Sequence, residues 1–338
     1  MAEDFNREEF LKALEKAGEE LHNASQLGSR LGKKDFKRLY LVACGAPNRE
    51  MLICEYWLQR LSRTLEVRRY FPAEFVHQDP VAIDENTLVI LASHSGTTPE
   101  TVSAAQFLKD KPCTTVAITQ KGDSPLAQEV QNVLLYGESD RGAYAMFILL
   151  LALVSGFFNE VEGWDLHDKV IHSLEAFPAA LADAIETNDA RATEDARIYK
   201  DDRILYIVGA GPMFSSAYVF GVCILMEMQW MHVQPLLAAE FFHGPFEIVD
   251  ETVPLILLIG EDPGRPEAER VVRFCKKYTE RLIIYDSADF EMKGIDKEVR
   301  PIIAPLILEA ALSRMADHLA VWHNQPLTTR RYMWKTEY

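Results

Sequence analysis

LYLVACGA at residues 39–46 returns later in the chain as LYIVGAGP at residues 205–212. Each run is a short apolar segment ending in small residues, which is typical of a buried strand that leads into a turn. In both copies the next buried strand follows at the same distance along the chain, as TLVILAS at 87–93 and VPLILLIG at 253–260. A repeat of this kind predicts two copies of one α/β unit.

Helical patterns separate these apolar runs from one another and from further strands at 113–119, 133–136 and 281–286. Strands that alternate with helices at this spacing indicate parallel, doubly wound sheets. We therefore expect an α/β fold with two three-layer lobes in tandem. The expected parts are a leading helix (1–35), a first lobe (36–164), a helical crossing (165–200), a second lobe (201–323) and a tail (324–338).

Composition excludes some classes of partner. The chain has 338 residues, of which 48% are hydrophobic and 25% charged, as in an ordinary soluble globular protein. Its net charge of -16 argues against a nucleic-acid surface, and any phosphate must be held by local donors. The five cysteines are scattered and odd in number, and the N-terminus has no secretion-signal pattern. Both features lead us to expect a cytoplasmic protein with reduced cysteines.

Residues 142–159 carry no charge and are of borderline length for a membrane span. This segment stands alone in the chain and contains Ser155-Gly156, and acidic segments follow it. A helix buried at a domain or subunit interface is the better interpretation, so no membrane partner is expected.

A second apolar helix, expected at 214–231, contains one ionisable group, Glu227. A carboxylate in apolar surroundings is costly to ionise, so its pKa should rise unless a partner holds the charge. His243 follows at a bend made by Gly244 and Pro245. Such a carboxyl group and an imidazole suit proton transfer near neutral pH. The alternative is a buried glutamate bonded to the backbone and a histidine in an ordinary turn.

The segment SHSGTTPET (93–101) directly follows the strand at 87–93 and precedes a helix. Hydroxyl groups, a glycine and a helix N-terminus together can hold a phosphate without a lysine. The alternative is a serine- and threonine-rich helix cap that binds no ligand. At the matching loop of the second lobe, Glu261 and Asp262 would repel a phosphate. No dinucleotide fingerprint, nucleophile elbow or metal-ligand spacing is present, so no cofactor and no metal are expected.

SHSGTTPET after a buried strand resembles the signature of the sugar isomerase (SIS) domain, and the repeat resembles a tandem pair of such domains. The segments MEMQW (226–230), EFFHGPFEIVD (240–250) and TTRRYMWKTEY (328–338) are similar to those of bacterial fructosamine-6-phosphate deglycases. The resemblance implies that Glu227 and His243 are catalytic and that Lys335 of the tail reaches into the site. It places substrate-binding residues at Gly45, Ala46, Ser93, His94, Ser95 and Thr98.

The resemblance further implies an enzyme that cleaves a 6-phosphorylated Amadori compound without a cofactor. It implies a homodimer as well, because in this family the histidine comes from the neighbouring subunit. Ile224 stands where the related synthases have a second lysine, which argues against synthase chemistry. Three alternatives stay open: another sugar-phosphate isomerase, an aminosugar-phosphate deaminase, and a non-catalytic phosphosugar sensor. The amine carried by the substrate cannot be inferred from the sequence.

Overall fold

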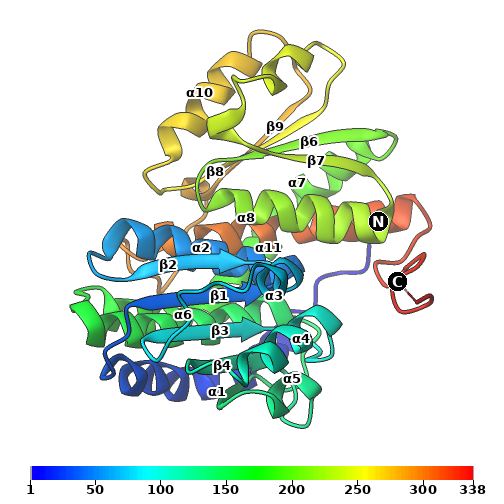
Figure 1. Ribbon diagram of the computed structural model, residues 1–338. Helices are drawn as coiled ribbons and strands as arrows, with labels where there is room; N and C mark the ends of the chain where they lie inside the picture. Colours follow the sequence, from blue (N-terminus) through cyan, green and yellow to red (C-terminus); the bar gives the residue numbers. More distant parts are fainter. Residues whose placement is uncertain (1, 338) are drawn as a thin grey trace. The chain divides into compact units, whose positions relative to one another are not determined.

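The computed structural model describes residues 2–337 and divides into two compact units, each built on a parallel sheet (Figure 1). The first unit comprises residues 7–178 and 294–299, and the second comprises the other described residues. The predicted α/β fold is thereby confirmed. The helix α7 (His167–Tyr199) passes from one unit to the other, and the division falls at its internal proline, Pro178.

The sheet of the first unit has five parallel strands in the order β2-β1-β3-β4-β5. Their bounds are β1 Arg38–Ala43, β2 Glu66–Tyr70, β3 Thr87–Ala92, β4 Thr114–Thr119 and β5 Asn132–Leu135. β3 and β4 are buried along their whole length, which explains why both read as continuous runs rather than as alternating patterns.

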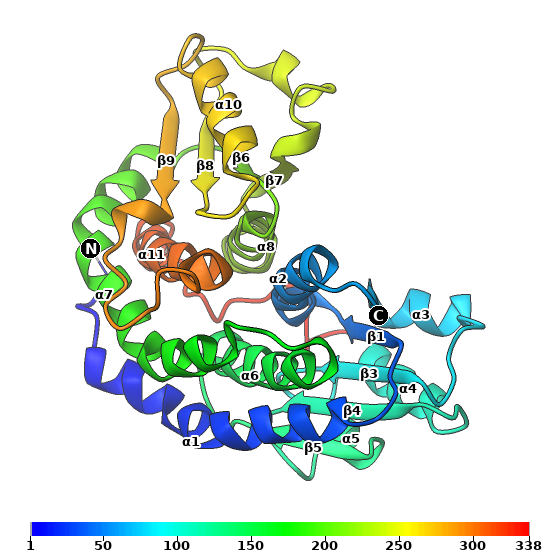
Figure 2. The ribbon, with the colours of Figure 1, turned by 90° about the vertical axis from the view of Figure 1, so that its left-hand side faces the viewer.

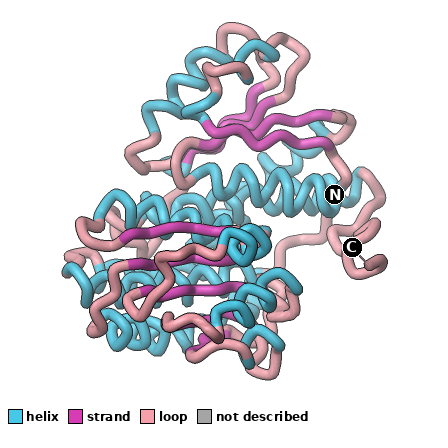
Figure 3. Tube along the Cα trace, in the orientation of Figure 1, coloured by secondary structure: helices cyan, strands magenta, loops and turns pink. Residues whose placement is uncertain are grey.

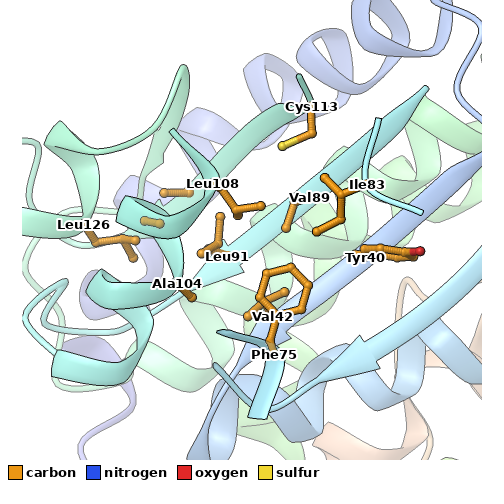
Figure 4. Packing of buried hydrophobic residues seen from close by; sticks show 12 residues of the cluster. Tyr40, Val42, Phe75, Ile83, Val89, Leu91, Ala104, Leu108, Cys113 and Leu126 are labelled. Carbon is orange, nitrogen blue, oxygen red and sulfur yellow. The ribbon is translucent and has the colours of Figure 1, made fainter. Parts of the chain in front are cut away.

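Helices cover both faces of this sheet. They are α1 Arg7–Gly32, α2 Gly45–Leu61, α3 Pro72–Gln78, α4 Pro99–Leu108, α5 Pro125–Gln128 and α6 Gly142–Glu162. The helices α3, α4 and α5 lie on one face, whereas α2 and α6 lie on the other, with α1 running beside α6 (Figure 2). Figure 4 shows the core under α3 and α4, where Phe75 and Leu108 pack against Val42 and Leu91 of the central strands.

The helix α6 is the uncharged segment that raised the question of a membrane span. Among the described residues it is the one helix long and apolar enough to cross a membrane, and 89% of its most apolar window is buried inside the protein. The prediction of a buried helix here is confirmed.

The sheet of the second unit has the order β7-β6-β8-β9, so it repeats the first without the last strand (Figure 3). The strands are β6 Ile204–Gly209, β7 His232–Leu237, β8 Leu255–Ile259 and β9 Leu282–Asp286. α10 (Arg265–Cys275) covers one face, and α8 (Met213–Tyr218) lies with α11 (Arg300–Trp322) on the other (Figure 1). The shared strand order confirms the predicted repeat.

The structure adds elements that the sequence did not predict, namely β2, α3 and β7. The apolar helix expected at 214–231 is also less regular than expected. It begins as α8, continues as a π-helical segment, η1 (Val219–Met226), and ends as the single turn α9 (Glu227–Gln229). At its end Met226 and Trp230 are 40% and 41% exposed, whereas Gln229 and Met231 are buried, so this end is apolar but only partly covered.

Candidate active site

The first sheet has a topological switch point between β1 and β3. The chain builds outward from these two strands in opposite directions, and in such sheets ligands bind at the carboxyl ends of the strands at this point. Ala43 at the end of β1 pairs with Ala92 at the end of β3. The segments 44–46 and 93–98 therefore leave the sheet side by side at the same edge.

Residues 93–98, named here the hydroxyl loop, are held by their own side chains. The buried Ser93 Oγ lies 2.9 Å from Thr98 Oγ1 and accepts a 3.2 Å hydrogen bond from the Gly96 N–H. Ser95 Oγ lies 2.8 Å from Thr97 Oγ1 and accepts from the Thr97 N–H at 3.2 Å. The loop leads directly into α4, whose free N–H groups favour an anion.

Position 96 of this loop can be occupied without strain only by glycine. Its φ is 67°, and an added Cβ would lie 2.3 Å from Ser124 Oγ. Its carbonyl accepts a 2.9 Å hydrogen bond from the N–H of Leu126, so the loop is fixed against the start of α5. The hydroxyl groups are therefore presented by a backbone that has little freedom to move.

His94 points toward the end of β5. Its Nδ1 lies 2.8 Å from the hydroxyl of Tyr136, the two rings stack with centroids 6.0 Å apart, and the ring packs on Gly142. Burial raises the pKa of Tyr136, so this phenol keeps its proton and can donate it to Nδ1. Nε2 would then carry the proton of the ring and act as a donor.

Gly45 and Ala46 begin α2 at the same sheet edge. Gly45 has φ 63° and open space around it, so the backbone turn rather than a close contact favours glycine there. One residue here that sequence reasoning missed is the buried Asn48. Its Nδ2 donates to the carbonyls of Ala43 at 2.8 Å and Tyr70 at 3.0 Å, which ties the ends of β1 and β2 together. This role had no signal in the sequence, because β2 itself was not predicted.

Glu227 lies in the second unit, at the end of the π-helical segment. Its side chain is 27% exposed, and its Oε1 lies 2.8 Å from the guanidinium of Arg330 in the tail. Burial raises the pKa of Glu227 above its ordinary value, and the Arg330 charge opposes this rise. The predicted environment for this carboxyl group is thus present, together with a cationic partner that the sequence analysis did not assign.

A cavity of about 340 Å³ adjoins Glu227. Its lining combines two guanidinium groups with aromatic and thioether side chains, and consists of Met226, Glu227, Trp230, Met231, His232, Arg330, Arg331, Tyr332 and Met333. This volume lies within the range of small-molecule sites, about 300–1,000 Å³. The cavity is formed entirely by residues of the second unit.

The tail is anchored beside Glu227 by hydrogen bonds to the end of the apolar helix. Gln325 Nε2 donates to the Met228 carbonyl at 2.6 Å, and Gln229 Nε2 donates to the Gln325 carbonyl at 2.8 Å. Lys335 donates to the carbonyl of Arg330. The tail cation that contacts Glu227 is therefore Arg330, whereas Lys335 bonds to the tail's own backbone. The sequence showed several tail cations but gave no signal for which one reaches Glu227.

His243 is exposed on a turn that follows β7, as its Gly-Pro neighbours predicted. Its N–H donates to the Glu240 carbonyl at 3.0 Å. It is not among the residues that line the Glu227 cavity, so the structure of one described chain does not bring the two side chains together there. Their joint action stays a prediction.

The matching edge of the second sheet is occupied by its own interactions. Glu261 Oε1 lies 3.0 Å from Arg300 Nε, and Asp262 Oδ1 accepts from the Gly264 N–H at 2.7 Å. No group of three or more potential metal ligands occurs among the residues 2–337 that the structure describes. The two regions that could bind or transform a ligand are thus the hydroxyl loop in the first unit and the Glu227 cavity in the second.

Comparisons with known proteins place this arrangement in a family. The family model described as the SIS domain matches residues 34–155, which contain the hydroxyl loop. The fructosamine deglycase FrlB of Bacillus subtilis is 39% identical over 90% of this chain and 94% of its own length. The agropine synthesis conjugase of Rhizobium rhizogenes is 32% identical over 89% and 87%, and the fructoselysine 6-phosphate deglycase of Escherichia coli is 27% identical over 89% and 86%.

A solved structure agrees with these sequence relatives. The crystal structure of a proposed phosphosugar isomerase from Bacillus subtilis superposes with a TM-score of 0.89 at 38% identity, and the match covers 97% of this chain and 99% of that chain. Both lobes take part in a match of this extent. The chain therefore belongs to the SIS-domain family in its tandem, two-lobe form, and its relatives there include bacterial fructosamine deglycases.

Proposed function

We propose that the protein is a deglycase that cleaves a 6-phosphorylated Amadori compound into glucose 6-phosphate and a free amino acid. The observation that carries this proposal is the Glu227 carboxyl group, whose pKa burial raises and which lies against a cavity of ligand size. A carboxylate with a raised pKa is a stronger base for a proton on carbon. The names of two relatives, a fructosamine deglycase and a fructoselysine 6-phosphate deglycase, support the substrate class.

In this proposal the hydroxyl loop holds the 6-phosphate. Ser93, Ser95 and Thr98 supply hydroxyl groups, and the N-terminus of α4 supplies N–H groups and a favourable dipole. His94 donates from Nε2. Gly45 and Ala46 bind the sugar, and Lys335 of the tail contacts the substrate.

The reaction then proceeds by proton transfers. His243 moves a proton from the anomeric hydroxyl to the ring oxygen, which opens the ring and leaves a ketone at C2. Glu227 removes a proton from C1, the electron pair forms the C1–C2 double bond of an enaminol, and the C2 carbonyl oxygen takes up a proton to become its hydroxyl group. A proton returned to C2 gives an imine between C1 and the amine nitrogen. Water adds to C1, the C1–N bond breaks with protonation of nitrogen, and glucose 6-phosphate and the amino acid are released.

Product release tests the proposal. Glucose 6-phosphate is measured with a panel of fructosamine 6-phosphates for the wild type, Glu227→Gln, His243→Ala and a control, Glu280→Gln, which removes an exposed carboxylate. We expect turnover by the wild type and the control, and a loss of roughly 10²–10⁴-fold in each of the other variants. Near-normal turnover in Glu227→Gln or His243→Ala would contradict the assigned roles. Release of ammonia from glucosamine 6-phosphate instead would indicate a deaminase.

A second candidate function is the formation of such a conjugate. It is favoured by one observation, the 32% identity to a protein named a conjugase. The same proton transfers between C1 and C2 serve both directions, so the candidate residues do not distinguish them. Incubation with glucose 6-phosphate and free amino acids, followed by mass spectrometry of the products, separates condensation from cleavage.

We also propose that the protein acts as a cytoplasmic homodimer in which His243 completes the active site of the partner. The exposed position of His243, outside the cavity that Glu227 lines, supports a shared site. All five cysteines are thiols rather than disulfides, as is usual for proteins of a reducing compartment.

A further inference from the structure

The Glu227 cavity contains two arginines, and they differ in whether other groups of the protein already pair with the guanidinium. Arg330 is buried and committed, because it pairs with Glu227 at 2.8 Å and donates to the carbonyls of Leu327 and Thr329, both at 2.9 Å. Arg331 is exposed, and in the described part of the chain it has no carboxylate or carbonyl partner. Its guanidinium carbon lies 4.0 Å from the ring centroid of Trp230. Arg331 is therefore positioned by its contact with Trp230, but no carboxylate of the described residues neutralises its charge.

Trp230, the residue under Arg331, is in a backbone conformation that is costly for its size. It follows the last helical turn with φ 56°, and the next N–H bonds back to the Leu225 carbonyl at 3.2 Å, at the position where helices usually have glycine. A non-glycine residue there costs on the order of 1–2 kcal/mol. The result is an indole, 41% exposed, on which Arg331 stacks at the wall of the cavity.

We infer that this cavity binds the carboxylate of the amino-acid part of the substrate, and that Arg331 is the residue that recognises it. The inference rests on the proposed function and names the residue that distinguishes conjugates of amino acids from conjugates of simple amines. In a conjugate linked through the α-amino group the carboxylate carbon is three bonds from sugar C1, a reach of about 4 Å. A base that acts on C1 must therefore have the carboxylate close by, and the cavity beside Glu227 offers the guanidinium of Arg331.

The rest of the lining fits the remainder of an amino acid. Met226, Met231 and Met333 provide flexible thioether side chains, which adapt to apolar groups of different shape. Arg331 offers a planar pair of N–H donors that matches a carboxylate. The competing anion is the sugar phosphate itself, which the proposal assigns to the hydroxyl loop, so an experiment must separate the two.

Equilibrium binding of matched, uncleavable analogues tests the inference. The probes are the reduced hexitol 6-phosphate conjugates of glycine and of methylamine, which differ only in the carboxylate and have no carbonyl group at C2. Dissociation constants are measured by calorimetry for the wild type, Arg331→Ala, Arg331→Lys and Arg270→Ala. Arg270 is a matched control because its guanidinium also stacks on an aromatic ring, that of Phe242 at 4.2 Å, outside the cavity.

We expect the wild type and Arg270→Ala to bind the glycine conjugate roughly 10–150-fold more tightly than the methylamine conjugate, as for one charge-assisted hydrogen-bonded pair. In Arg331→Ala this ratio should fall to about one, with the affinity for the methylamine conjugate unchanged, and Arg331→Lys should restore part of it. An unchanged ratio in Arg331→Ala, a wild-type ratio near one, or equal weakening of both conjugates, which would indicate phosphate binding, overturns the inference. Absence of turnover with every conjugate would contradict the proposed function alone, because the binding ratio does not depend on cleavage.

Discussion

Two opposing effects act on the carboxyl group of Glu227. Burial disfavours the charged form and raises the pKa, while the Arg330 guanidinium 2.8 Å away favours the charged form. A general base must be deprotonated at the working pH and still bind a proton well. In the proposed mechanism the pair meets both requirements, with the buried Arg330 as a positioning residue that holds the carboxylate in one orientation.

Replacing Arg330 should move the pH dependence of activity. In Arg330→Gln the charge that favours ionised Glu227 is lost, so the pKa of Glu227 rises further and the base stays protonated to higher pH. We expect the acidic limb of the kcat/KM profile to shift to higher pH, with activity at neutral pH reduced roughly 10–100-fold. The measurement is the pH profile of glucose 6-phosphate release, with Arg270→Ala as control. An unmoved acidic limb would show that Arg330 does not act on the base.

Gly96 fixes the backbone of the hydroxyl loop, so replacing it should affect stability and phosphate binding. In Gly96→Ala a Cβ would lie 2.3 Å from Ser124 Oγ on a backbone with φ 67°, so the hydroxyl loop must distort. We expect a loss of stability of about 2 kcal/mol and weaker binding of inorganic phosphate. Gly18→Ala is the control, since it lies exposed in α1 with open space around it and should gain about 0.5–1 kcal/mol. Thermal unfolding and phosphate titration measure both, and wild-type phosphate affinity in Gly96→Ala would contradict the loop's role.

Among the elements, the central strands β1, β3, β4, β6 and β8 and the edge strands β5 and β9 were predicted from the sequence. β1, β3, β6 and β8 are buried apolar runs, and their pattern follows from burial on both faces. The unpredicted β2 and β7 are edge strands. β2 reads EVRRY, with three charged residues, and β7 contains Pro235, which an edge strand tolerates. Their identity as strands depends on pairing with β1 and β6, which local patterns do not reveal.

The π-helical segment could not be predicted from the sequence either, because its hydrogen-bond pattern leaves no mark on composition. The run 214–231 has the composition of a helix, but the Glu227 N–H bonds to the Val222 carbonyl, five residues back. One extra residue in the turn changes the direction in which later side chains point. Helical periodicity therefore identified Glu227 as an acid in an apolar helix and could not show that it faces Arg330.

The helix α11 contains a carboxyl group that makes stability depend on pH. Glu309 is 4% exposed, and burial raises its pKa to about 8. Because the folded pKa is above the unfolded value, the folded state keeps its proton where the unfolded state has lost it. The stability contribution is then full below about pH 4.5 and is lost as the pH rises toward about 8.

Glu309→Gln should remove this loss. We expect the wild type to lose on the order of 4 kcal/mol of unfolding free energy from this group between about pH 5 and pH 8. The variant, which carries no titratable group there, should be less affected by pH and more stable than the wild type at pH 8. Denaturant unfolding at several pH values measures the difference, with the exposed Glu280→Gln as control. Parallel pH dependence in the wild type and Glu309→Gln would argue against a neutral Glu309.

For the whole molecule, the repeat in the sequence correctly gave two lobes of one topology. The candidate site could be predicted only in part. The hydroxyl loop follows from local sequence, since it adjoins its own strand and helix. Arg330 and Arg331 could not be placed, because the tail has no helical or strand period and its position depends on long-range bonds such as Gln229 to Gln325. The proposed pairing of Glu227 with a partner's His243 is a property of the assembly.

Mixing two inactive variants tests that shared site. If each active site takes Glu227 from one subunit and His243 from the other, a mixed dimer of Glu227→Gln and His243→Ala has one intact site. After unfolding and refolding together in equal amounts, half of the dimers are mixed, so we expect about a quarter of the wild-type activity. Each variant refolded alone is the control. No recovery in the mixture would mean that both residues serve the same subunit's site.

The central claim is that Glu227 moves hydrogen between C1 and C2 of a phosphorylated sugar–amino acid conjugate. The most direct measurement is NMR analysis of the sugar product formed from a fructosamine 6-phosphate in D₂O. The account predicts glucose 6-phosphate for the wild type, with deuterium at C2 to the extent that the proton on Glu227 exchanges with D₂O before it returns, and a greatly reduced yield for Glu227→Gln. Fructose 6-phosphate as the product, or equal formation of labelled glucose 6-phosphate by Glu227→Gln, would contradict it.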